Sequence, residues 1–191
     1  MRISPRLFAL VPAAVAINLV VGSVVRELAL PVFLDTIGTV LVAVLEGVWA
    51  GALTGTISQL LVGLLTGYQY FPFVVIQWLL ASLASAAARR RGFARMPATI
   101  VWGILCGLCC GAASAVISYT LFRGVTGGGV TWVTAMIRAA GEPLPVAVAI
   151  GSGATDVLDK SIVIVLVGVV LRTFPRRILG RFPLAARSIG R

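Results

Sequence analysis

Apolar residues fill the chain in long runs, and polar residues fall mainly between those runs. Runs of this length predict transmembrane helices, because about 20 apolar residues in a helix cross a hydrocarbon core of roughly 30 Å. The run at residues 33–65 is interrupted only by Glu46 and Gly47. As a single helix rising about 1.5 Å per residue it would reach roughly 50 Å, so we expect two helices joined by a tight turn. We therefore predict six spans, at residues 7–25, 33–46, 48–65, 72–88, 98–122 and 156–172.

Residues 124–153 are rich in Gly and Pro and look too interrupted to cross a membrane. We expect them to form an outer loop with partial helices. The chain is 59% apolar and only 12% charged, a balance outside the range of soluble globular domains. Because the spans recur along the whole length, we predict one all-α integral membrane domain over residues 1–191.

The basic residues indicate how the spans are oriented. Twelve of the 16 basic residues lie in segments 2–6, 89–95 and 172–191, which share one side if six spans alternate. The other side receives Arg26, Arg123 and Arg138, with Lys160 at its boundary. The positive-inside rule then places both termini in the cytoplasm. We interpret the net charge of +10 as serving to orient the protein in the membrane and to contact anionic membrane lipid. Nucleic-acid binding is not expected, because stacking aromatics do not interleave with the arginines.

Uncommon polar residues gather in the outer halves of the predicted spans, whereas the inner halves are nearly pure Val, Leu, Ala and Gly. Intramembrane polar groups are costly and by default suggest a site facing the bundle interior. We predict an outward-facing pocket that is closed below. The candidate substrate-binding residues are Asp35, Gln59, Gln77, Trp78, Asp156, Asp159 and Lys160. The same depth holds Asn18, Thr36, Thr39, Ser114, Ser118 and Tyr119.

Each candidate also has a structural interpretation, which the sequence leaves open. Asp156 could cap the predicted sixth helix, and Asp156 with Lys160 is an i,i+4 pair in the favourable order. Gln59 and Gln77 could hydrogen-bond each other across two helices. Trp78 could be an interfacial anchor instead of a ligand contact.

Small residues recur at a spacing of four on three predicted spans, which places each set on one helix face and allows close helix approach. The sets are Gly47, Gly51 and Gly55; Gly103, Gly107 and Gly111; and Ala9 with Ala13. For the glycines we predict packing within the chain. For the two alanines, a neighbour in this chain and a different protein both remain open.

Several chemical functions are disfavoured by the sequence. The string GSGATDVLDKS resembles a phosphate-binding loop, but Asp159 stands where that loop needs glycine before Lys160 and Ser161, so the chain is not expected to hydrolyse ATP. No serine has a base beside it, and the chain has no histidine. The cysteines at 106, 109 and 110 lack a second ligand pair and are a weak zinc signal. We expect no catalytic, metal or cofactor site.

Two stretches resemble a known family: FLDTIGTVLVAVLEGVWAGALTGTISQLLVGLL and the C-terminal DVLDKSIVIVLVGVVLRTFPRR. Together with the six short spans, they are similar to the substrate-binding S components of energy-coupling factor (ECF) vitamin transporters. The resemblance implies capture of a vitamin or related micronutrient in an outward-facing pocket. It also implies three partner subunits, a transmembrane coupling protein and two cytoplasmic ATPases that hydrolyse ATP, in a bacterial or archaeal cytoplasmic membrane.

The resemblance carries over to particular residues. Ala9 and Ala13 match the small-xxx-small feature with which the family's first helix docks on the coupling protein. The seven candidate residues would build the pocket, with residues 124–129 and the segment around Arg138 as lids. The charges on Asp156, Asp159 and Lys160 would then read a zwitterionic or polar ligand. The main alternative is a ligand-sensing membrane module without transport, and a less favoured one is an enzyme acting on lipid head groups.

Overall fold

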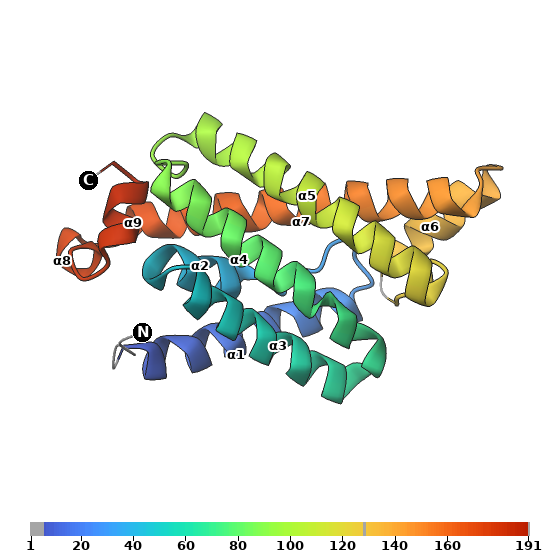
Figure 1. Ribbon diagram of the computed structural model, residues 1–191, viewed down its shortest axis with the longest axis horizontal. Coiled ribbons are helices and arrows are strands. Elements are labelled where there is room, and N and C mark those ends of the chain that lie inside the picture. The colour runs from blue at the N-terminus through green and yellow to red at the C-terminus, as the bar shows by residue number, and fades with distance from the viewer. Residues whose placement is uncertain (1–5, 128, 191) are drawn as a thin grey trace.

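The computed structural model describes residues 6–127 and 129–190, and within them it contains helices and no strand (Figure 1). Four helical segments are long and apolar enough to cross a membrane: Leu7–Glu27, Val48–Thr66, Tyr68–Arg89 and Met96–Phe122. The elements in chain order are α1 (Leu7–Glu27), α2 (Ile37–Glu46), α3 (Val48–Thr66), η1 (Tyr68–Phe73), α4 (Val74–Arg89), α5 (Met96–Phe122), α6 (Gly129–Ala139), α7 (Leu144–Thr173), α8 (Arg176–Leu179) and α9 (Pro183–Ser188).

The turn expected at Glu46 and Gly47 is confirmed. Helix α2 ends at Glu46, α3 begins at Val48, and Gly47 between them has a φ of +99°, a conformation that side chains rarely adopt. The two helices then pack closely, because a Cβ added at Gly51 would lie only 2.5 Å from the Cβ of Ala43.

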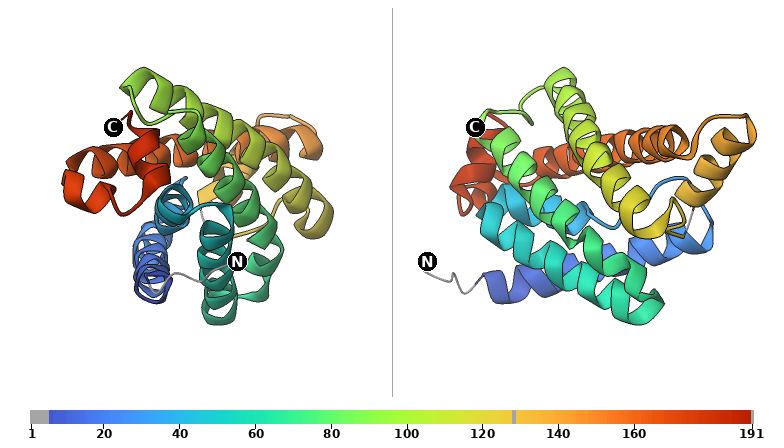
Figure 2. Two further views of the ribbon diagram at one scale, coloured as in Figure 1. Left: turned by 60° about the vertical axis from the view of Figure 1, so that its left-hand side comes forward. Right: turned by 45° about the vertical axis from the view of Figure 1, so that its right-hand side comes forward.

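Helices α5 and α7 form an antiparallel pair on one side of the molecule, with α1 and α3 on the other side (Figure 2). The glycines of α5 make this contact possible. A Cβ at Gly107 would lie 2.4 Å from the Cα of Val157. Cβ atoms at Gly103 and Gly111 would lie 2.8 and 2.9 Å from Cα atoms of α7. The internal packing predicted for this glycine set is confirmed, and it brings two backbones together as apolar membrane helices require.

Helix α7 corrects the predicted sixth span. It begins at Leu144, twelve residues before the expected start at Asp156, and runs for 30 residues. Most of the region expected as an outer loop is therefore helical, as α6 and the first half of α7. Pro143 and Pro145 do not break α7, because they lie at its N-terminus, where a missing N–H costs little. Asp156 lies in the middle of the helix, so the helix-capping interpretation of this residue is wrong.

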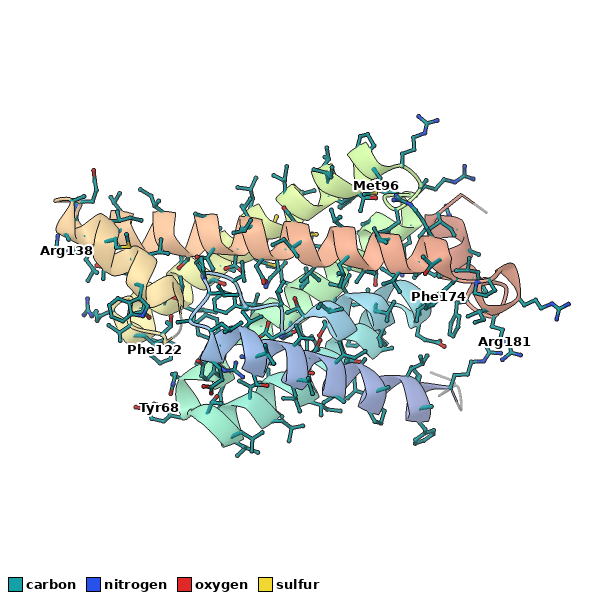
Figure 3. All side chains as sticks on the ribbon, turned by 180° about the vertical axis from the view of Figure 1, so that it is seen from behind. Tyr68, Met96, Phe122, Arg138, Phe174 and Arg181 are labelled. Carbon is teal, nitrogen blue, oxygen red and sulfur yellow. The ribbon has the colours of Figure 1, made fainter. Side chains whose placement is uncertain are left out.

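The two ends of the long axis differ in charge. The segments around Met96, Phe174 and Arg181 lie at one end, and Tyr68, Phe122 and Arg138 lie at the other (Figure 3). We call the first the arginine end and the second the cavity end. At the arginine end, α8 and α9 fold back on the bundle and bury Leu179, Phe182 and Ala185. Arg2 and Arg191, which were counted for the same side, lie outside the described residues.

The predicted second span is helical over only part of its length. Residues 28–36 connect α1 to α2 without forming a helix; residues 28–31 are exposed, residues 32–35 are half-buried, and Leu34 has a φ of +50°. The α2 helix that follows has ten residues, about 15 Å, or half of a hydrocarbon core. Non-helical backbone at this depth is tolerated only where it is buried in protein or lines a cavity. The second condition is met here, because Phe33, Asp35 and Thr36 line a cavity.

Candidate functional site: a buried polar cavity

A cavity lies between the α5–α7 pair and helices α3 and α4, on the cavity-end side of the apolar core, with about 580 Å³ of empty space when its open mouth is included. It is surrounded by side chains from α3, η1, α4, α5, α6 and α7, from the non-helical segment 28–36 and from the connection between α5 and α6. The lining residues are Phe33, Asp35, Thr36, Gln59, Tyr70, Phe73, Ile76, Gln77, Ser114, Ser118, Thr126, Val130, Ser152, Asp156 and Lys160.

The charged residues of α7 form one buried cluster in its wall. The Lys160 ammonium lies 2.5 Å from Oδ2 of Asp159 and 3.4 Å from Oδ1 of Asp156, and all three residues are at most 2% exposed. The i,i+4 pair of Asp156 and Lys160 is thus confirmed. One ammonium is shared by two carboxylates, which compensates charges that would otherwise be very costly to bury.

Asp159 has a structural task that the sequence did not reveal. Its Oδ1 accepts hydrogen bonds from the backbone N–H groups of Phe33 and Leu34, at 2.9 and 2.7 Å. These bonds hold the non-helical segment 28–36 against α7 and satisfy two of its donors. Asp159 therefore lies one layer behind the cavity wall and supports the backbone that carries Asp35 and Thr36.

The opposite wall is held by a chain of amide hydrogen bonds. The Thr39 hydroxyl donates to Oε1 of Gln77 at 2.9 Å, and Nε2 of Gln77 donates to Oε1 of Gln59 at 3.1 Å. Nε2 of Gln59 then donates to the carbonyl of Tyr70 at 2.8 Å. The predicted bond between the two glutamines is confirmed, and both side chains also line the cavity. Each has one amide hydrogen left over for a ligand.

Asn18 extends this chain to the start of α2. Its Oδ1 accepts from the backbone N–H of Gly38 at 2.7 Å, and its Nδ2 donates to Thr39 and Ser58 at 3.1 and 3.0 Å. The N-terminus of α2 is thereby capped from a different helix. Thr36 occupies the N-cap position, yet its hydroxyl makes no capping bond. Its Oγ1 is buried without a hydrogen-bond partner and borders the cavity.

Asp35 is the second unpartnered group in the wall. It receives no hydrogen bond or ion pair from the described residues, although it interacts electrostatically with Lys160 and with Arg26. Its place depends on Gly22 of α1, since a Cβ there would lie 2.8 Å from the Cβ of Asp35.

Three aromatic rings give the cavity flat apolar walls: Phe33, Tyr70 and Phe73. Each is fixed by a neighbour on one side. Lys160 lies 5.7 Å from the Phe33 ring centroid and Arg26 lies 5.5 Å from that of Tyr70, while Phe73 stacks on Phe122 at 6.2 Å. Rings held in this way present preformed surfaces for the apolar part of a ligand.

Toward the cavity end, Thr126 and Val130 close the wall and are at most 7% exposed. The segment 124–129, whose role as a lid stays a prediction, lines the cavity through Thr126, and Gly128 lies outside the described residues. The other expected lid does not line it: Arg138 lies at the far tip of the molecule, where its guanidinium donates to the Glu142 carbonyl (Figure 3).

Toward the arginine end, the cavity floor is apolar. One turn or more below the polar residues, the inward faces of α2, α4 and α7 carry Val44, Leu80, Ala84, Val163 and Val167, all at most 1% exposed. Ser85 lies among these residues, and its hydroxyl bonds to the Ala43 carbonyl. Two further buried polar atoms on these helices, Oε1 of Glu46 and Oγ of Ser161, have no hydrogen-bond partner among the described residues and do not line the cavity. The cavity is a dead end.

The structure brings five of the seven predicted residues to the cavity wall: Asp35, Gln59, Gln77, Asp156 and Lys160. Asp159 lies behind the wall, as described above. Trp78 lies elsewhere, with 45% of its surface exposed, its indole N–H donating to Thr56 and its ring edge-on to Trp49.

Other lining residues were missed because their segments were misjudged. Ser152 precedes Asp156 and Lys160 at a spacing of four, a signal for one helix face that was overlooked because its segment was expected to be a loop. Tyr70 lies in η1, between two predicted spans. Phe33 is an ordinary apolar residue by sequence, and only the non-helical path of residues 28–36 turns it toward the cavity.

In comparisons with known proteins, no family model, no curated protein and no solved structure matches the chain.

Proposed function

We propose that this protein is the substrate-capturing S component of an ECF-type importer for a vitamin or related micronutrient. The observation that carries the proposal is the dead-end cavity, which is lined by polar and aromatic side chains and sealed by apolar packing toward the arginine end. Such a site suits tight capture from one side and does not provide a path through the bundle. The sequence resemblance supplies the importer class.

The membrane arrangement is part of this proposal. Six segments would cross: α1, residues 28–36 with α2, α3, η1 with α4, α5, and α7. The described arginines at residues 89–95 and 172–187 gather at the end that also holds the start of α1, which the positive-inside rule assigns to the cytoplasm. The cavity would then open toward the outside through the segment 124–130.

Release of a ligand to the cytoplasm requires an input of energy from partners. The floor under the cavity is packed with fully buried aliphatic side chains, and the chain lacks a phosphate-binding loop. Under the proposal, a coupling protein and two cytoplasmic ATPases supply this work. On α1, Ala9 and Ala13 are both exposed. That face is available for the coupling protein, as the resemblance implies.

The test is an uptake assay combined with partner recovery. The tagged protein is purified in mild detergent from cells that also express its coupling protein and ATPases, and native mass spectrometry identifies small molecules bound to it. We expect a bound micronutrient with a dissociation constant in the nanomolar range, about −12 kcal/mol. Cells should accumulate that compound only when the ATPases are intact.

The alternatives give different results in the same assay. Binding without uptake, and without recovery of a coupling protein, would favour the sensing module. Conversion of the bound compound into a product by the purified protein alone would favour an enzyme. Either outcome contradicts the importer proposal.

A further inference from the structure

The charges around the cavity do not balance. Three carboxylates, on Asp35, Asp156 and Asp159, lie around one ion-paired ammonium, on Lys160, while the Arg26 guanidinium interacts electrostatically with Asp35 without forming an ion pair. The Lys160 ammonium is already shared by Asp156 and Asp159, and Asp159 also accepts two backbone N–H bonds. Within the described residues, Asp35 has no such partner. The sequence suggested that both positive and negative side chains would bind the ligand. In the structure, the Lys160 ammonium instead forms its ion pairs within the protein.

Thr36, the next residue, provides an independent sign of a missing partner. Its side chain is 2% exposed, its Oγ1 has no hydrogen-bond partner, and it lines the same cavity. A buried hydroxyl left without a partner is costly, and such groups are rare in native structures. The usual use of a threonine at this position, capping its own helix, is absent because Asn18 bonds to the helix N-terminus instead.

Both groups are held in place by contacts with other segments of the chain. Asp159 fixes the backbone of Phe33 and Leu34 just before them, and glycine at position 22 leaves the room that Asp35 fills. The rings of Phe33, Tyr70 and Phe73 surround the same space. A carboxylate, a hydroxyl and aromatic walls in a buried cavity complement a positive charge on a flat or compact apolar body.

We propose that the cavity selects a small organic cation, an amine or a protonated or quaternised nitrogen on an aromatic ring, with its positive charge at Asp35 and a hydrogen-bonding group at Thr36. This inference rests on the proposed function for its biological meaning, but it specifies the ligand class of the cavity by itself. Binding of such a cation neutralises the uncompensated carboxylate and provides the Thr36 hydroxyl with its partner.

The test uses three probes that share one ring and differ in charge: benzylamine, benzyl alcohol and benzoate. Thermal unfolding of the full chain in lipid nanodiscs is followed with each probe at about 10 mM, enough to detect millimolar binding by mass action. We expect benzylamine to raise the midpoint and to bind about tenfold more tightly than benzyl alcohol. Benzoate should have no effect.

Two variants locate the effect. Asp35→Asn keeps the shape of the side chain and should abolish the preference for benzylamine. The matched control is Glu142→Gln, which removes a carboxylate that is exposed near the cavity end but lies outside the cavity, and the preference should survive. Thr36→Val removes a hydroxyl that has no partner, so it should leave the unliganded midpoint unchanged or higher. The same change should weaken binding of an aromatic amine that carries a hydroxyl, 3-hydroxybenzylamine, severalfold.

Three results would overturn the inference. The first is a larger rise in the unfolding midpoint with benzoate or benzyl alcohol than with benzylamine. The others are an undiminished preference for benzylamine in Asp35→Asn, and no rise of the midpoint with benzylamine. Failure of the importer proposal looks different. If benzylamine is preferred but no coupling protein is recovered, the cation site stands without the importer. If uptake is found for a neutral or anionic compound, the importer stands without the cation site.

Discussion

The cavity half and the arginine half of this protein are held together by different forces. In the cavity half, side-chain hydrogen bonds run from Asn18 through Thr39 and Gln77 to Gln59, and an ion cluster surrounds Lys160. In the arginine half, the interior is aliphatic and its charged side chains lie mostly on the surface.

The difference shows that the free-energy cost of burying polar groups falls mainly in the cavity half. Apolar packing alone holds the lower half, so the buried polar groups above are not needed to make a bundle. They instead create a cavity whose walls are held by hydrogen bonds and ion pairs between segments. In the described part of the chain, buried oxygens without a hydrogen-bond partner occur at Thr36, Glu46 and Ser161, and of these residues only Thr36 lines the cavity, beside the unpaired carboxylate of Asp35. Polar residues inside membranes concentrate at functional sites for this reason.

The sharpest way to break the comparison is to remove the central cation. Lys160→Ala would leave two buried carboxylates without their shared partner, and we expect the free energy of unfolding to fall by about 3–5 kcal/mol. In the arginine half, Arg172→Ala removes hydrogen bonds to the Phe93 carbonyl and to Thr99 at a half-buried site and should cost about 1–2 kcal/mol. Unfolding in mixed detergent measures both, and equal losses would contradict the contrast drawn between the halves.

Next in size is the contact that joins α5 to α7. Gly107→Val should destabilise by about 3 kcal/mol, because even its Cβ would lie 2.8 Å from the Asp156 carbonyl oxygen, and the helices would have to separate. The control is Ala112→Val on the exposed face of the same helix, for which no loss is expected. The measurement is the thermal unfolding midpoint of each variant. A similar midpoint for both would show that close approach of the two helix backbones is not required.

A smaller effect is expected in the amide chain. Gln77→Leu leaves the Thr39 hydroxyl without its acceptor and Gln59 Oε1 without its donor, so unfolding should become easier by about 1–2 kcal/mol. Ser82→Ala serves as control, since that hydroxyl bonds only to the Trp78 carbonyl of its own helix. If the two variants unfold alike, the chain does not stabilise the cavity wall.

The smallest effect on stability is expected on the outer face of α1. The double change Ala9→Leu and Ala13→Leu should alter the free energy of unfolding by less than about 0.5 kcal/mol, because both sites are exposed. Under the importer proposal, recovery of the coupling protein should nevertheless drop about tenfold, a loss of roughly 1.4 kcal/mol of association. Val20→Leu, an exposed site further along α1, is the control, and undiminished recovery in the double variant would remove this face from the docking hypothesis.

Sequence patterns predicted the local elements well where one strong signal decided them. The turn at Gly47, the α5 glycine face and the pairing of Gln59 with Gln77 all follow from spacing and residue type. The start of α7 was misjudged because its first half is rich in Gly and Pro, which usually interrupt helices. In the structure these glycines pack against neighbours instead: a Cβ at Gly151 would meet Thr134 of α6 at 2.6 Å.

The sequence predicted most of the polar residues at the site, but not the structural role of each one. Asp35, Asp156, Asp159 and Lys160 are equally conspicuous as charges in an apolar chain. Which carboxylate stays unpaired depends on contacts between segments more than a hundred residues apart, such as that of Asp159 with Phe33 and Leu34.

By itself, the sequence determined that this chain is a bundle of apolar helices with arginines at one end and polar residues toward the other, because hydrophobic length and charge act locally along the chain. Only the tertiary structure decided that Lys160 forms its ion pairs within the protein, that Asn18 caps α2, and that Asp35 and Thr36 line the cavity without hydrogen-bond partners among the described residues. A buried polar group is satisfied by whatever partner the fold brings to it, and that partner comes from another segment of the chain.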